Sequence, residues 1–411
     1  MGLYEFFIGL FILASFITRT IGGDDGLFSR IIVADIFGAL AILTYLLYGK
    51  RYISSPRVTS GWILIASFAL GILWSYEPLK SSFEVIILLF LLLIYSTIIS
   101  HYNSPSRFNK LIIAFAWASL LGALIGLYDS FIGGHGLPRI FPERARGEAL
   151  SGFRNAGQAG AYMLISIIVL FAFYNSKLFF ELNRKQKNLI RCSLLFSFLF
   201  FITTGKIAAY IGFVVSFLSY FIYKRNAKVL IGTAIVTIAI TFVLINLENI
   251  SPIIYNRLEQ KVQTRIVEPY EGKENNAGSK FLKSNYSGAL ESFNDNPITA
   301  SGIGGFMGRY GRYEVHSTYL KIIGETGLVG IVGYLIFMFY FLRLFFVSSK
   351  IDKANPYASF IKELAPLIIG CVVSWGYTYH LRKREFWIMY AIVYIAFRLM
   401  KRWDKKEMNH E

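Results

Sequence analysis

Long apolar stretches separated by short polar segments are the dominant pattern along this chain. A stretch of roughly 17–25 apolar residues is long enough to cross the ~30 Å hydrocarbon core of a bilayer as a helix. A window of about 19 residues marks about twelve such stretches. They lie near residues 3–19, 31–48, 60–77, 82–100, 111–129, 158–175, 189–204, 206–223, 229–247, 317–346, 361–378 and 385–400. Because the bilayer core offers no water to backbone polar groups, helices are the expected spanning elements. The pattern therefore predicts an all-α polytopic membrane protein.

Polar segments divide the predicted helices into three parts. Residues 1–247 form an N-terminal transmembrane bundle of about nine spans, residues 248–316 form one large loop, and residues 317–411 form C-terminal transmembrane helices with a cytoplasmic tail. Only Thr204-Gly205-Lys206 separates the seventh span from the eighth. This short break is either a tight hairpin or the interruption of one element.

The large loop contains one segment with helical periodicity. Apolar side chains recur at near-helical spacing across residues 280–293, so we predict an amphipathic helix whose apolar face rests on the membrane surface. The segment from Asn294 to Pro297 ends it, because the residue before a proline disfavours the α region. Several glycines follow, which allow tight turns or the close approach of a ligand.

Positive charge is in excess along the chain. Forty-two Lys and Arg residues stand against 25 Asp and Glu residues, a formal net charge of +17. The positive-inside rule and attraction to anionic lipids account for most of this excess, and they place both termini in the cytoplasm and residues 248–316 outside. The basic loop from His380 to Glu385 breaks the rule: either a span is miscounted, or these cations are retained for a purpose. Nothing in the pattern indicates binding to nucleic acid.

Signals for bound metals or nucleotide cofactors are missing from the sequence. Cys192 and Cys371 both lie within predicted spans, so they indicate neither a disulfide framework nor a metal set. The aspartates near span ends lack ligand-like spacing, and Walker, dinucleotide and nucleophile-elbow motifs are absent. We therefore expect chemistry without a metal or a nucleotide cofactor.

His316 is the first candidate for catalysis, because it stands where the polar loop meets the apolar stretch that follows. An unperturbed imidazole titrates near pH ~6.5 and can accept a proton at neutral pH. The alternative is a structural or interfacial histidine at a helix start. Glu325, about two turns into the next span, is either a paired acid inside the bundle or a supporting residue of the same site.

Cations gather on the side predicted to lie outside. Charges near span ends usually extend to the interface and do nothing further, but arginine also binds phosphate in a bidentate manner. A lipid diphosphate would match both the location and the sign of the cluster. The candidate cations are Arg146, Arg154, Lys206, Arg309 and Arg312.

Two motifs carry a resemblance to a known family. The chain reads P-x-x-x-x-G-I-G-G-F from Pro297 and H-S-x-Y-L-x-x-x-x-E-x-G-L-x-G from His316. Together they resemble the signature of the O-antigen ligase/polymerase family of bacterial membrane glycosyltransferases. Weaker similarity extends upstream to FRNAGQAGAYMLI, TTGKIAAYIGFVVSF and KFLKSNYSGALESFNDNP, so the resemblance covers roughly residues 140–346.

The resemblance implies a GT-C-like helical bundle in the bacterial inner membrane with a large periplasmic loop. Its members move a glycan from an undecaprenyl-diphosphate carrier to an acceptor hydroxyl on a glycan or lipid, with inversion and without a metal. His316 would match the histidine that takes the acceptor proton, and Arg154 and Lys206 would match positions that hold the diphosphate. Lys280 and Lys283 stand where the loop helix usually carries an arginine. Lysine also replaces arginine at position 206, and serine replaces asparagine after His316.

Other functions stay open at this point. A ligase and a polymerase differ in their acceptor, which the sequence does not specify, and a protein-glycosylating member is a further possibility. A solute transporter would also carry many spans, although we find no repeat symmetry between the two halves. A non-catalytic scaffold of a polysaccharide export complex is the remaining alternative.

Overall fold

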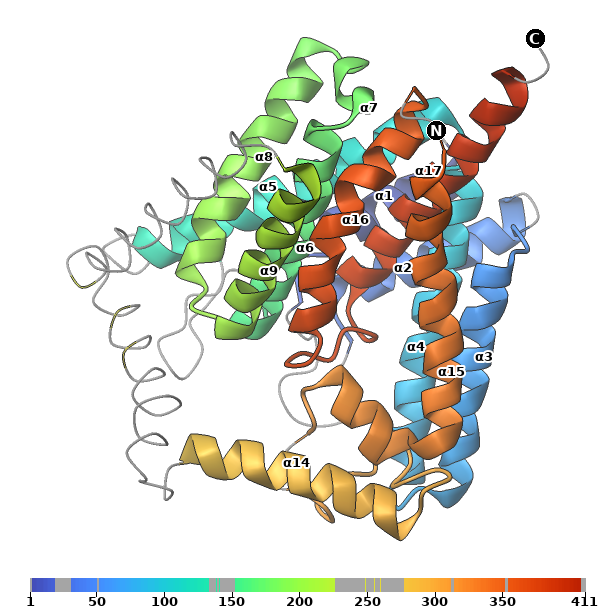
Figure 1. The fold of residues 1–411 in the computed structure, drawn as a ribbon, viewed down its shortest axis with the longest axis vertical. Coiled ribbons are helices and arrows are strands. Elements are labelled where there is room, and N and C mark those ends of the chain that lie inside the picture. Colours follow the sequence, from blue (N-terminus) through green and yellow to red (C-terminus); the bar gives the residue numbers. More distant parts are fainter. Residues whose placement is uncertain are drawn as a thin grey trace.

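The computed structural model describes residues 2–18, 31–49, 52–132, 152–225, 277–311, 314–351 and 354–407, together with the isolated positions 138, 140, 248, 255 and 259. Within these parts of the chain the fold is all-helical and contains no strand (Figure 1). The helices are α1 (Leu3–Ala14), α2 (Val33–Tyr48), α3 (Pro56–Leu70) with the 3-10 turn η2 (Gly71–Trp74), α4 (Pro78–His101), α5 (Pro105–Phe131), α6 (Ala156–Tyr174), α7 (Lys177–Phe180), α8 (Arg184–Thr203), α9 (Ile207–Lys224), α14 (Ala277–Asp295), α15 (Thr318–Ser349), α16 (Pro356–Ser374) and α17 (Arg384–Glu407).

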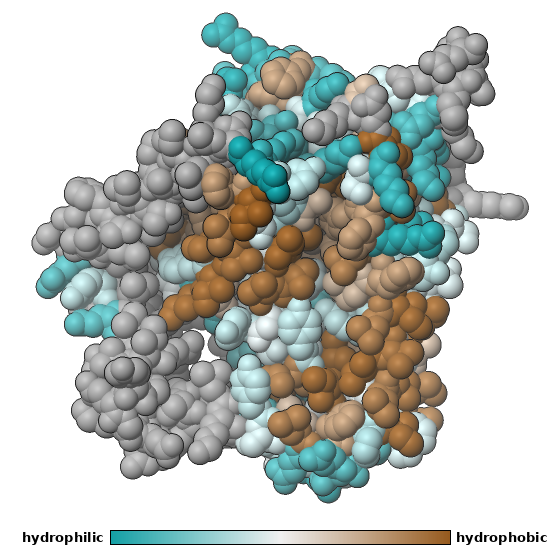
Figure 2. Space-filling model, viewed as in Figure 1, coloured by the Kyte–Doolittle hydropathy of each residue, from teal (hydrophilic) through white to brown (hydrophobic). Residues whose placement is uncertain are grey.

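The predicted spans coincide with helices, apart from 229–247, which lies outside the described residues. Of the helices described, seven are long and apolar enough to cross a membrane. These are α3 with η2, α4, α5, α6, α9, α15 and α16. Figure 2 shows apolar side chains across the middle of one face and hydrophilic ones above and below them. The chain is therefore a multi-pass helical membrane protein.

Local sequence explains where several of these helices begin. A proline opens α3, α4, α5 and α16. The first helical position suits proline, because its fixed φ is already helical and its missing N–H has no partner there in any case. Asn155 and Ser317 precede α6 and α15 and accept a hydrogen bond from the backbone of the first turn.

Helix α17 lies in the centre of the bundle. It packs against α4, α5, α6, α15 and α16, and every residue from Phe386 to Phe397 is buried. Charged residues at its ends keep it out of the set of apolar spans, although its middle is enclosed by protein. Helices from the first and third predicted parts of the chain thus share one hydrophobic core.

Helix α15 is interrupted at Gly327, where the sequence predicts a continuous span. Gly327 has φ +58° and separates a short first segment from the long apolar one. The break frees backbone groups, which cost several kcal/mol each if they stay unpaired in hydrocarbon. The N–H of Leu328 donates to the Pro297 carbonyl at 2.8 Å, and Ser292 Oγ donates to the Gly324 carbonyl at 2.6 Å. The polar loop therefore pairs the groups that the break releases.

The segment between α8 and α9 is a tight hairpin. Gly205 has φ +58°, a left-handed conformation that favours glycine. Its N–H donates to the Tyr210 hydroxyl at 2.9 Å, and that hydroxyl donates to the Ile202 carbonyl. One side chain therefore joins the two arms, and Lys206 is held at the start of α9.

The predicted loop helix is present as α14, which crosses below α15 in Figure 1. Its inner face is made of small and polar residues, because Gly288 and Ala289 lie against the Tyr310 backbone and Gly324. Tyr286 and Leu290 are exposed on the other side. Contact of this face with a membrane surface stays a prediction.

Candidate active site

His316 is an exposed residue in a segment whose neighbours are all held in place. Val315 is buried in a small core with Phe306 and Tyr310. Ser317 caps α15, and the N–H of Thr318 donates to the Trp375 carbonyl at 3.0 Å. Anchoring on both sides fixes the backbone of His316, while its imidazole stays accessible to solvent.

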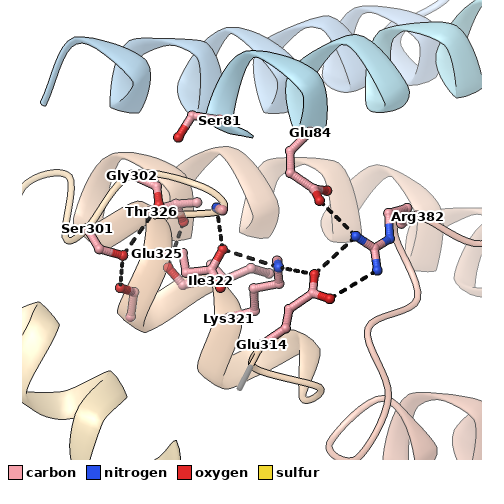
Figure 3. Close-up of polar contacts among 12 residues, drawn as sticks. Ser81, Glu84, Ser301, Gly302, Glu314, Lys321, Ile322, Glu325, Thr326 and Arg382 are labelled. Carbon is pink, nitrogen blue, oxygen red and sulfur yellow. Dashed lines mark hydrogen bonds and ion pairs between the residues drawn. The ribbon is translucent and has the colours of Figure 1, made fainter. Parts of the chain in front are cut away.

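A network of charged side chains lies beside this segment (Figure 3). Lys321 bridges two carboxylates, with its Nζ 3.0 Å from Glu314 Oε1 and 3.2 Å from Glu325 Oε2. Arg382 then joins Glu314, at 3.0 Å, to Glu84 of α4, at 2.7 Å. Lys321, Glu325 and Glu84 are nearly inaccessible to water. Such charges stay ionised inside a protein only when partners compensate them.

The glycine-rich loop is attached to this network by a backbone bond. The N–H of Gly304 donates to Glu325 Oε2 at 2.6 Å. Gly302, with φ +77°, packs so closely on the α3–α4 connection that an added Cβ would lie 2.5 Å from Ser75 Cβ. Gly304 lies over Glu84 with more room, because an added Cβ would be 3.3 Å from Glu84 Cγ. The loop, α4 and the first segment of α15 therefore form one connected unit.

His380 joins the α16–α17 loop to the start of α15. Its Nδ1 lies 2.9 Å from Thr318 Oγ1, and its ring stacks on Trp375 with centroids 3.8 Å apart. Because the Thr318 hydroxyl donates to the Thr378 carbonyl, it accepts from Nδ1, which places the His380 proton on that nitrogen. Burial lowers the pKa of His380 well below its usual value, so the ring is neutral. The contact between His380 and Thr318 fixes the loop next to α15, and Arg382 of that loop pairs with Glu84 and Glu314.

Lys206 and the segment that carries Arg154 lie at the same end of the bundle. The Lys206 side chain packs on α6, with its Nζ 3.6 Å from the position that a Cβ on Gly157 would take. Arg154 immediately precedes the cap of α6, and its N–H donates to Thr18 Oγ1 at 2.8 Å. Both cationic side chains are half-buried. In the sequence, only the family resemblance connects Arg154 with Lys206.

The electrostatic surroundings of His316 favour its neutral form. The imidazole is exposed, but neighbouring protein displaces part of the water around it, and this partial desolvation lowers the pKa of His316 below its usual value of 6.5. The Glu314 carboxylate opposes that shift, whereas the charges of Lys206, Lys321 and Arg382 add to it. The fold therefore brings His316 and Lys206 close enough to interact. A neutral imidazole is the form that can accept a proton.

The other predicted site residues are distributed differently. The Arg309 guanidinium lies 3.6 Å from the centre of the Tyr76 ring, so it covers the α3–α4 connection. Glu325 forms a buried ion pair with Lys321, as the interpretation of Glu325 as a paired acid inside the bundle predicts. Lys280 and Lys283 belong to α14, but their side chains are not described, and Arg146 and Arg312 lie outside the described residues. Within those residues no group of three or more His, Cys, Asp or Glu could hold a metal ion.

Sequence reasoning missed Glu84, Glu314, Lys321 and Arg382. One signal pointed to them: the basic loop from His380 to Glu385 broke the charge rule. Its Arg382 pairs with Glu84 and Glu314, and its Arg384 pairs with Asp35 of α2. Arg382 and Arg384 therefore have a structural role, because they compensate the charges of carboxylates within the protein.

Comparison with known proteins finds a family match over the part of the chain that carries His316. The family model for O-antigen ligase matches residues 192–335, from α8 to the middle of α15. The chain carries an O-antigen ligase domain. That domain contains Lys206, α14, the glycine-rich loop, His316 and Glu325, whereas Arg154 and Arg382 reach its site from outside the matched residues. No curated protein matches the chain. This match, together with the apolar helices, supports a membrane enzyme of the O-antigen ligase/polymerase type.

Replacing Glu325 by glutamine should loosen the glycine-rich loop of the O-antigen ligase domain. The change removes the charge that pairs with the buried Lys321 and weakens the bond from the Gly304 N–H. We expect a loss of about 2 kcal/mol in stability, seen as a lower midpoint of thermal unfolding in detergent. Glu77→Gln is the control, because the Glu77–Lys80 pair is much more exposed to water than the Glu325–Lys321 pair and should contribute little. Equal midpoints for both variants would contradict the prediction.

Proposed function

We propose that this protein transfers a glycan from an undecaprenyl-diphosphate carrier to an acceptor hydroxyl, with inversion and without a metal. The observation that supports the proposal is an accessible imidazole, His316, on an anchored backbone and within the electrostatic reach of the Lys206 cation, both in the O-antigen ligase domain. A base and an anion-binding group are the two elements that such a transfer requires.

In this mechanism His316 takes the proton of the acceptor hydroxyl as its oxygen attacks the anomeric carbon of the donor. The bond between that carbon and the phosphate oxygen breaks, and the lipid diphosphate leaves with the electron pair. Attack opposite to the leaving group inverts the anomeric centre. Arg154 and Lys206, with Arg309, Arg312, Lys280 and Lys283 as further candidates, stabilise the charge that develops on the diphosphate. Glu325 and Arg146 support the site, Glu325 by holding the glycine-rich loop.

The proposal includes the location of the site. Helices α15 and α6 begin at the end of the bundle where His316 and Arg154 lie. We propose that this end faces the periplasm of a bacterial inner membrane, and that about twelve spans form a GT-C-like bundle with 248–316 as a periplasmic lid between the helices of residues 1–247 and 317–411. We favour a polymerase slightly over a ligase.

Glycan profiling of a deletion strain tests the function. The strain is complemented with the wild type, Arg154→Ala or Lys206→Ala, with Lys185→Ala, an exposed lysine at the other end of α8, as the control. Removing one group that stabilises the developing charge should reduce transfer about 10²–10³-fold, while the control keeps the normal profile.

The pattern of loss distinguishes the remaining functions. Loss of long polymer with single repeats still attached to the acceptor indicates a polymerase. Loss of all attached glycan, with polymer accumulating on the lipid carrier, indicates a ligase. A normal profile from both variants would overturn the diphosphate site and make a solute transporter the better interpretation.

A further inference from the structure

We propose that Glu314 is a positioning residue for His316, and that Arg382 of the α16–α17 loop holds the Glu314 carboxylate in the position that this role requires. The inference rests on the proposed role of His316 as the base. It assigns a part in the reaction to a carboxylate and an arginine that lie far apart in the sequence and that no motif connects.

The contacts of Glu314 are more extensive than a surface ion pair requires. Arg382 binds it through two nitrogens, Nη1 at 3.0 Å and Nη2 at 3.3 Å, and Lys321 Nζ approaches Oε1 at 3.0 Å (Figure 3). A two-point arginine contact fixes the direction of a carboxylate as well as its distance. Glu314 is therefore held from two different elements, the α16–α17 loop and the first turn of α15.

Arg382 itself is held against α4. Its Nη1 lies 2.7 Å from Oε1 of the buried Glu84. Burial would by itself lower the pKa of Arg382, but the carboxylates of Glu314 and Glu84 raise it above its usual value, so the guanidinium stays charged. Arg382 thus links α4, through Glu84, to the segment that carries Glu314 and His316.

The segment has a reason to need this support. His316 is exposed, so packing alone does not determine where its ring lies, and Glu314 is only two residues away. A displacement of about 1 Å at a reacting group can cost about 10²-fold in rate. Glu314 fixes the backbone on one side of His316. Its negative charge also raises the pKa of the ring, which opposes the lowering by Lys206, Lys321 and Arg382.

The test measures the protonation of His316 without any substrate. Purified full-length protein in detergent is treated with diethyl pyrocarbonate, which reacts with neutral imidazole, and mass spectrometry follows the peptide that contains His316 across a pH series. The charged groups that face the ring are Glu314, Lys206, Lys321 and Arg382. Glu314→Gln removes the negative charge, so the reaction midpoint should move to lower pH. Arg382→Gln removes a positive charge while Lys321 still holds Glu314, so the midpoint should move to higher pH.

Arg384→Gln is the matched control. It removes an arginine and its ion pair from the start of α17, where the side chain pairs with Asp35 of α2 and bonds only the backbone carbonyl of Arg382, not the His316 segment. Its midpoint should equal that of the wild type. If Arg382→Gln fails to fold because Glu84 is left as an uncompensated charge, the double variant Arg382→Gln/Glu84→Gln replaces it.

Glycan profiling of the same variants completes the test. Glu314→Gln should reduce transfer about 10²-fold with a normal amount of folded protein in the membrane. Unchanged midpoints in Glu314→Gln and Arg382→Gln, or normal transfer by Glu314→Gln, would overturn the inference. If His316→Ala retained full transfer while the midpoints moved as expected, the proposed function would fail instead.

Discussion

Replacing His316 by alanine is expected to reduce glycan transfer by about 10²–10⁴-fold, the usual contribution of a positioned general base. The residue is exposed, and its neighbours are anchored through their own side chains or backbone. The substitution should therefore leave the fold and the amount of protein in the membrane unchanged. The measurement is the profile of attached glycan in a deletion strain that carries the variant.

Two further observations separate a lost base from a damaged site. Added imidazole should restore part of the activity of the alanine variant, because a small base can occupy the vacated position. In the wild type, transfer should persist below pH 6.5 and decline only as the pH falls through the lowered pKa of His316, because the protonated ring cannot accept a proton. Full activity of His316→Ala would remove His316 from the mechanism.

Replacing Gly327 by alanine is expected to destabilise the protein by about 2–4 kcal/mol. Gly327 adopts φ +58°, which disfavours a side chain, and an added Cβ would lie 2.5 Å from the Ile298 carbonyl oxygen. The backbone would have to move away from the loop that pairs the groups freed by the helix break. Thermal unfolding in detergent should show a lower midpoint, and transfer should fall because His316 and the glycine-rich loop are held by the same segment.

Two control glycines separate the causes of this effect. Gly308 also has a positive φ, +96°, but an added Cβ would meet nothing within 4 Å, so Gly308→Ala should cost about 1 kcal/mol from backbone strain alone. Gly9 lies within α1 and has open space around it, so Gly9→Ala should be neutral or slightly stabilising. Equal stability of Gly327→Ala and Gly9→Ala would mean that the break in α15 is not required.

Sequence and structure agree best on the helices and least on the connections between distant charges. The glycines of α15 illustrate the difference. Gly333 packs closely on Ser67 of α3, the usual role of a small residue at a contact between membrane helices. Gly327 breaks the helix instead, because the loop carbonyls of Pro297 and Ile298 accept hydrogen bonds from the N–H groups of the two residues that follow it.

The sequence by itself determined that the chain crosses a membrane as helices, where most of them lie, and which family motif surrounds His316. These properties are local, since the length and period of an apolar stretch decide whether it can pair its own backbone in hydrocarbon. Only the tertiary structure decided which charges meet. Arg382 reaches Glu84 across 298 residues of sequence, and a contact of that kind depends on how whole helices pack, which no single stretch of the chain encodes.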